Sequence, residues 1–186
     1  NELASLYFVR GSSNRELALA RLKYGNDHEQ AKKEYKKAVE DYRFAASMEF
    51  LQHPKYKQDL RHYNVLLAKA LIDAPEGLQN MEWNLEAVRA AKKAHKAGGF
   101  MRADNIAVLA KAYMSVGKFK KAKDTYEEAK VLIRQMLNTQ AINKKTYEVL
   151  MKKIEQSTDE LDKKEKDKKE KQNESRIYKF IKGFTI

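Results

Sequence analysis

The stretch IAVLAKAYMSVGKFKKAKDTYEEA, residues Ile106 to Ala129, decides the fold of this chain. Its apolar side chains follow a helical period as far as Tyr113, and Gly117 marks the end of that helix. A second helical period opens at Ala122 and continues through Tyr126. The spacing therefore predicts two helices joined by a tight turn, which approach closely at the alanines and are filled out by the tyrosines.

The same pattern occurs a second time, which makes it a repeat. Between Leu17 and Tyr42, the residues Ala31, Tyr35 and Ala38 reproduce the spacing that opens the second helix of the quoted stretch. A middle helix pair is interrupted from Asp73 to Glu82 by about seven residues beyond the usual repeat length. The pattern resembles the tetratricopeptide repeat (TPR), in which stacked helix pairs bury a continuous core.

The resemblance implies an all-α fold: a TPR α-solenoid of about three helix-turn-helix repeats with a long C-terminal extension helix. We place the repeats at about residues 12–50, 58–98 and 102–137, within a TPR domain that covers residues 1–137. Composition favours the same class, because 34% of the residues are charged while glycine and proline number only 7 and 2. Residues 138–186 form the extension.

The extension changes character along its length. An apolar stripe from Thr146 to Leu161 predicts a helix that caps the last repeat. From Asp162 to Glu174 the stripe gives way to lysines that follow acidic residues by four positions. This spacing favours a projecting helix, and a frayed charged tail is the alternative.

The chain ends in RIYKFIKGFTI, which mixes basic and large apolar residues. A basic amphipathic segment of this kind can bind calmodulin, a membrane surface or another hydrophobic groove. Self-packing, against the solenoid or against a second copy, is the other interpretation. The residues expected to act in this C-terminal interaction segment are Tyr178, Phe180, Ile181 and Phe184.

The formal net charge of +12 raises the question of nucleic acid. The basic residues are spread along the chain and are not interleaved with stacking aromatics, so nucleic acid is the second choice and an acidic protein partner the first. The absence of cysteine excludes disulfides and cysteine-based zinc sites, and we expect a cytoplasmic protein. No apolar run approaches the roughly 18 residues of a membrane-spanning helix.

The sequence favours no enzymatic function. The four histidines, His28, His53, His62 and His95, are widely separated and form no metal-binding motif. The Gly98-Gly99 pair is not followed by the GK[ST] of a phosphate-binding loop and is better explained as a helix end. We therefore expect no catalytic residues, no cofactor and no metal.

The order of these parts resembles the C-terminal half of FK506-binding-protein-type immunophilin co-chaperones. AKKEYKKAVEDYR, from Ala31 to Arg43, is similar to the second helix of the family's first repeat. YNVLLAKAL, from Tyr63 to Leu71, is similar to the entry into its second repeat. In that family a prolyl-isomerase-like domain lies upstream, and the repeats bind the acidic C-terminus of Hsp90 or Hsp70. The resemblance implies an adaptor of the co-chaperone type.

The family's grip on a carboxylate uses five polar residues in the groove: Lys and Asn on the first helix, Asn on the third, and Lys and Arg on the fifth. The corresponding positions here are Glu16, Ala20, Leu66 or Ala68, Asp104 and Val108. An aspartate where the clamp needs a lysine repels the ligand. The resemblance thus implies a degenerate clamp, and a non-standard mode for any Hsp90 or Hsp70 partner.

We therefore predict a protein–protein interaction scaffold whose concave surface binds a protein or peptide partner. The alternatives are a nucleic-acid-associated protein of an RNA pathway and a self-associating structural module. The surface is expected to be formed by the first helix of each repeat. Its predicted lining residues are Lys23, His62, Lys69, Asp104, Lys111 and Met114.

Overall fold

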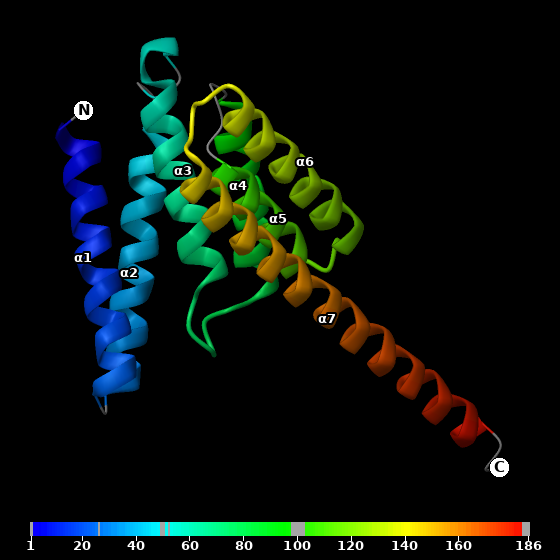
Figure 1. Cartoon of the computed structure of the whole chain (residues 1–186). Coiled ribbons are helices and arrows are strands. Elements are labelled where there is room, and N and C mark those ends of the chain that lie inside the picture. Colours follow the sequence, from blue (N-terminus) through cyan, green and yellow to red (C-terminus); the bar gives the residue numbers. More distant parts are fainter. Residues whose placement is uncertain (1, 26, 49–50, 52, 98–102, 184–186) are drawn as a thin grey trace.

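The computed structural model describes the backbone of residues 2–25, 27–48, 51, 53–97 and 103–183. Side chains are described for the same residues except 103, 104 and 177–183. Over these ranges the chain contains helices and no strand, which confirms the all-α class (Figure 1).

Seven α-helices and one short 3-10 helix follow one another in this part of the chain. They are α1 (Glu2–Tyr24), α2 (His28–Ser47), η2 (Pro54–Tyr56), α3 (Lys57–Ile72), α4 (Met81–Lys96), α5 (Ala103–Ser115), α6 (Phe119–Asn138) and α7 (Lys144–Gly183). The most extensive contacts join α1 to α2, α3 to α4 and α5 to α6, and each pair also touches the next. The molecule is therefore a row of three helix pairs closed at one end by α7.

Side-chain caps and left-handed residues account for where several helices begin and end. Asp27 accepts a hydrogen bond from the Gln30 amide at 3.0 Å, and Asn80 accepts one from the Trp83 amide at 2.9 Å, so each satisfies a free donor at a helix start. Gly117 has a φ of 71°, which favours glycine, and it ends α5 as the sequence predicts.

Helix α1 begins at Glu2, about three turns before the first repeat expected from the sequence. Gly11 lies in the middle of this helix and is buried against α2. A Cβ atom at this position would lie 3.1 Å from the Cβ of Asp41 and 3.2 Å from the Ala38 carbonyl oxygen. The close packing of α1 on α2 therefore offsets the low helix propensity of glycine.

The apolar core has two parts that share α5. Val108, Leu109 and Ala112 join the cluster formed with the first two helix pairs. Ile106 and Ala110 face a second cluster, which contains Tyr126 and Ile133 of α6 and Ile154 and Leu161 of α7. Because α7 completes this second cluster, it covers the last helix pair as the sequence predicts.

The segment between α3 and α4 is a structured loop. Gln79 donates from its side-chain amide to the carbonyl oxygens of Ile72 and Ala74 at 3.0 and 2.8 Å, which satisfies acceptors at the end of α3. Gly77 lies close to Lys32 of α2, and Trp83 is partly buried against the core. The loop therefore packs mainly toward α2, and Trp83 fills space between helices.

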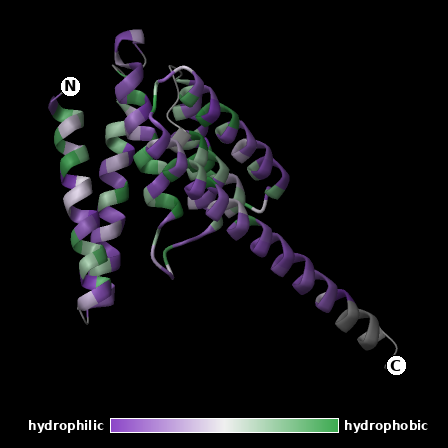
Figure 2. Ribbon diagram, in the orientation of Figure 1, coloured by the Kyte–Doolittle hydropathy of each residue, from purple (hydrophilic) through white to green (hydrophobic). Residues whose placement is uncertain are grey.

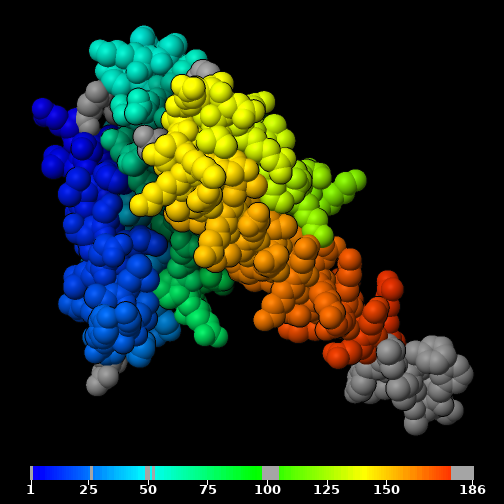
Figure 3. Space-filling view, in the orientation of Figure 1, coloured from blue at the N-terminus to red at the C-terminus, as the bar shows by residue number. Residues whose placement is uncertain are grey.

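Helix α7 is continuous for 40 residues, and its second half projects from the molecule (Figures 1 and 3). Leu161 is fully buried, and beyond it the described part of the helix is almost uniformly hydrophilic (Figure 2). Two of the predicted i,i+4 pairs form, Glu160 with Lys164 and Glu165 with Lys169, each at 2.9 Å. The projecting-helix prediction is confirmed for the backbone.

Candidate peptide-binding groove

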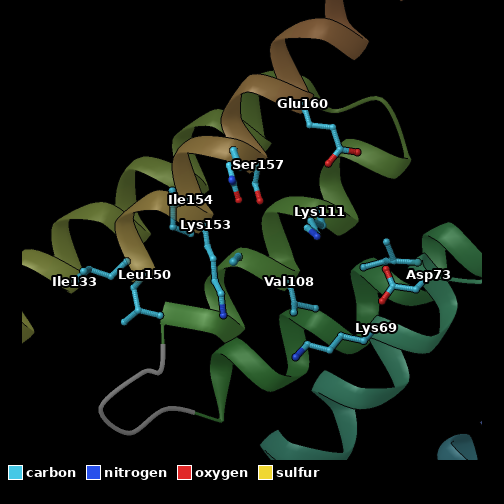
Figure 4. A pocket seen from close by; sticks show the side chains of 13 residues that line it. Lys69, Asp73, Val108, Lys111, Ile133, Leu150, Lys153, Ile154, Ser157 and Glu160 are labelled. Atoms are coloured by element: carbon cyan, nitrogen blue, oxygen red, sulfur yellow. The ribbon is translucent and has the colours of Figure 1, made fainter. Parts of the chain in front are cut away.

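A cleft of about 570 Å³ lies between α3, α5 and α7 (Figure 4). Helix α3 contributes its last turn, α5 contributes its middle, and α7 crosses opposite them. The first helices of the second and third pairs thus form one wall and the capping helix forms the other. The lining residues are Lys69, Ile72, Asp73, Ala107, Val108, Lys111, Ile133, Leu150, Lys153, Ile154, Gln156, Ser157 and Glu160.

Three lysines line this cleft, each from a different helix. Lys69 lies on α3, Lys111 on α5 and Lys153 on α7. Lys69 and Lys111 are half-buried and Lys153 is exposed. Within the described part of the chain, none of the three forms an ion pair within 4.0 Å. The three ammonium groups therefore lack a short-range carboxylate partner there, and Lys111 acts on Glu160 only at longer range.

Each of the two carboxylates of the cleft interacts with a cation that does not line it. Asp73 lies 3.9 Å from the guanidinium of Arg15 on α1. Glu160 accepts a contact of 2.9 Å from Lys164 one turn further along α7. The Lys164 hydrogen bond lowers the pKa of Glu160, and the positive charges of Lys164 and Lys111 act in the same direction. Both carboxylates are thus partly neutralised, and the lysines dominate the cleft's electrostatics.

Apolar side chains also line the cleft. Val108 and Ile154 are almost completely buried, at 5% and 4% exposure, so most of their apolar surface already packs inside the fold. Ile72 and Leu150 line the two sides. A site of this composition can hold an anionic group and an apolar side chain that lie next to each other in one ligand.

Of the predicted lining residues, the structure brings Lys69 and Lys111 together in the cleft. His62 is exposed on α3 two turns before Lys69, and its ring lies 5.2 Å from that of Phe8. Lys23 is exposed in the last turn of α1, with its ammonium group 4.7 Å from the ring of Tyr24. Neither His62 nor Lys23 lines the cleft.

The other two predicted lining residues lie on α5. Met114 is 8% exposed and packs in the second core cluster, because α7 covers this side of α5. Its side chain therefore belongs to the interior. Asp104 lies in the first turn of α5, and its side chain is outside the described residues.

At the positions that correspond to the family's carboxylate clamp, none of the described side chains is basic. These positions therefore give the cleft no positive charge. Glu16 is exposed and interacts with the neighbouring Arg15 at 3.1 Å. Ala20 is exposed on α1, and Ala68 is completely buried. The cleft lysines lie at other positions, with Lys111 one turn beyond Val108.

The C-terminal interaction segment is described only in part. Tyr178, Phe180 and Ile181 lie within the helical backbone of α7, and their side chains are outside the described residues. Phe184 is outside the described residues altogether.

Lys153 is the one lysine of the cleft that was not among the predicted lining residues. It lies next to Ile154, a member of the apolar stripe that predicts the capping helix. The stripe shows which side of α7 is buried, and its neighbours are the residues at the edge of the contact. The stripe therefore indicates that Lys153 lies at the edge of the buried side of α7. It does not indicate which helices Lys153 faces.

Comparison with protein-family models, curated proteins and solved structures finds no match to this chain. In the part of the chain that the structure describes, no three or more His, Asp or Glu side chains are placed to hold a metal ion. No described helix has the length and apolar character needed to cross a bilayer.

Proposed function

We propose that this chain is a TPR-type interaction adaptor, without enzymatic activity, that binds an acidic protein segment in the cleft between α3, α5 and α7. The observation that carries the proposal is the convergence of Lys69, Lys111 and Lys153 from three helices, with no ion-pair partner in the described part of the chain. Carboxylates of a partner would supply the negative charges that pair with these lysines. Such pairs gain strength at partly buried sites, where solvent screens them less.

The apolar side chains of the cleft restrict which partner segments can fit it. Ile72 and Leu150 line the cleft beside the lysines and are only half-buried by the fold. A partner segment with an apolar side chain beside its acidic residues would bury that side chain there, whereas a uniformly acidic segment would not. The expected ligand is therefore a short peptide that combines acidic and apolar residues.

The resemblance to immunophilin co-chaperones supports a choice of first probes, the acidic C-terminal peptides of Hsp90 and Hsp70. The cleft lysines differ in position from the clamp of that family, so the proposed mode is non-standard. Residues of α7 line the cleft together with those of α3 and α5, which supports including the extension helix in the proposed site.

Calorimetric titration of the chain with these peptides tests the proposal. Each acidic peptide is compared with a version in which every Asp and Glu is replaced by Asn and Gln. We expect the acidic peptides to bind more tightly. The double variant Lys69→Glu, Lys111→Glu should weaken binding by roughly a hundredfold, since each reversed charge in a partly buried site is worth at least about tenfold.

The matched control is Lys93→Glu, Lys96→Glu, which makes the same charge change on exposed residues of α4 outside the cleft. We expect it to change the affinity only by the few-fold of general charge attraction. Equal losses in both double variants, or equal affinity for the neutral peptides, would reject the cleft as the binding site.

A further inference from the structure

Helix α1 carries apolar side chains on the face turned away from the molecule. Leu3, Leu6, Val9, Leu17 and Tyr24 are all exposed, with Leu6 at 66%. They account for five of the ten large apolar side chains found exposed in the described part of the chain. A helix that is apolar on opposite faces is normally covered on both, and no described part of the chain covers the outer face of α1.

The inner face of the same helix is fully occupied. Ala4, Gly11 and Ala18, seven residues apart, are buried against α2. Figures 1 and 3 show α1 at the edge of the row of helices, opposite the end that α7 covers. Repacking of α1 within the chain therefore cannot cover the outer face without exposing the inner one.

The spacing of the outer residues is that of a seam between two paired helices. Positions separated alternately by three and four residues define this seam, and every one of them is exposed. Small residues near its middle permit close approach of a second helix. The seam consists of Leu3, Leu6, Arg10, Ser13, Leu17, Ala20 and Tyr24.

Arg10 is the charged member of the seam, and its charge is already balanced. Its guanidinium donates two hydrogen bonds to Asp41 of α2, one of them at 2.9 Å. A polar residue at one seam position sets the register of paired helices without preventing their association. Arg10 is therefore compatible with a covered seam.

We propose that a second copy of this chain covers the seam, with the two α1 helices packed antiparallel. In this arrangement Leu6 of each copy faces Leu17 of the other, and Leu3 faces Ala20. Glu2 then lies beside Lys23 of the second copy, and the twofold symmetry creates this pair twice. Neither residue has an ion-pair partner among the described residues. The charges at the two ends of α1 are complementary only in the antiparallel direction.

Analytical ultracentrifugation over a range of concentrations tests the association. We expect a dimer that dissociates on dilution. Leu6→Glu should raise the dimer Kd by at least about a hundredfold, because each dimer gains two charges that face leucine. The control Val131→Glu changes a side chain that is 50% exposed on α6 and should leave the Kd unchanged. Circular dichroism checks that both variants fold.

A monomer at every concentration, or equal weakening by both variants, would overturn the proposal. Loss through Leu6→Glu alone supports the α1 interface and separates it from association through the C-terminal segment. If Leu6→Glu does not fold, cross-linking through Ser13→Cys still tests whether α1 forms the interface.

Chemical cross-linking tests the direction. The chain has no cysteine, so a single introduced thiol is unique. With a short bismaleimide, Ser13→Cys should link two copies, because the seam's middle positions meet in the antiparallel pair. Ala20→Cys should not, because the two copies of residue 20 lie about 25 Å apart along the axis at about 1.5 Å per residue. Efficient linking through Ala20→Cys would indicate parallel helices and reject the antiparallel proposal.

Discussion

The two ends of the helix row are finished in different ways. At the C-terminal end, α7 buries Ile154 and Leu161 against α5 and α6, and then continues as a charged helix. At the N-terminal end, α1 packs one face on α2 and leaves Leu3 and Leu6 exposed on the other. A stack of repeats needs a polar outer face at both ends to remain dispersed.

The difference shows that a helix at the end of the row can serve either of two purposes in the same chain. Helix α7 ends the stack and also contributes Lys153 and Glu160 to the cleft. Helix α1, at the other end of the row, leaves apolar side chains exposed on its outer face. The covered end therefore belongs to peptide binding in our proposal, and the uncovered end to self-association.

The largest change in stability is expected from a substitution where α7 packs against the core. Leu161→Ala removes a completely buried side chain from the contact between α7 and the last helix pair. It should lower the free energy of unfolding by about 2–5 kcal/mol, as for other buried leucines. Urea denaturation followed by circular dichroism measures this change.

Leu85→Ala is the matched control, since Leu85 is 41% exposed on α4. The same truncation there should cost less than about 1 kcal/mol, because little buried contact is lost. If Leu161→Ala costs no more than Leu85→Ala, then α7 is not a structural cap, and the contrast between the two ends is wrong.

A smaller effect is expected from two equivalent tyrosines, one near each end. Tyr35 and Tyr126 occupy the same position in their helix pairs, and both are completely buried. The Tyr35 hydroxyl donates to the Ala70 carbonyl oxygen at 2.8 Å, whereas the Tyr126 hydroxyl has no hydrogen-bond partner among the described residues. Tyr35→Phe should therefore destabilise by about 1 kcal/mol and Tyr126→Phe by less, as measured by urea denaturation.

High pH gives an independent check on Tyr126. Burial raises its pKa from 10.0 to about 12. Its contribution to stability is then present below pH 10 and is lost as the pH rises from 10 to 12, because the unfolded chain releases this proton first. Tyr126→Phe should lose less stability than the wild type over this interval. Identical profiles would indicate that the hydroxyl is not desolvated by the cap.

Much of this contrast was predictable from local sequence, and the rest depends on long-range packing. The Gly117 turn, the paired tyrosines and the capping stripe that ends at Leu161 each have local signals, and the structure confirms them. The first ten residues of α1 carry Leu3 and Leu6 at helical spacing, but Gly11 is a weak helix former until α2 packs on it, so the sequence places the start of the first repeat only at about residue 12. Lys153 becomes part of the cleft through the crossing of α7 over α5, which no local pattern specifies.

The pairing of Asp162 illustrates the same limit. Its spacing predicts an ion pair with Lys166 four residues later. In the structure, Asp162 instead lies 2.7 Å from Lys123 of α6, which also lies 3.2 Å from Glu165. This three-residue cluster ties the first projecting turn of α7 to the last helix pair. Tertiary contact thus replaces the local pair.

The smallest change in stability is expected from removing the ion pairs between Lys123 and α7. Lys123 is exposed, and the salt bridges of exposed residues are screened by solvent and ions, so Lys123→Gln should leave global stability nearly unchanged. It should instead accelerate amide hydrogen exchange around Asp162 and Glu165, while exchange around the buried Ile154 stays slow. High salt should do the same to the wild type. Lys120→Gln, an exposed change on the same helix, is the control, and equal acceleration by both variants would show that packing alone positions this turn of α7.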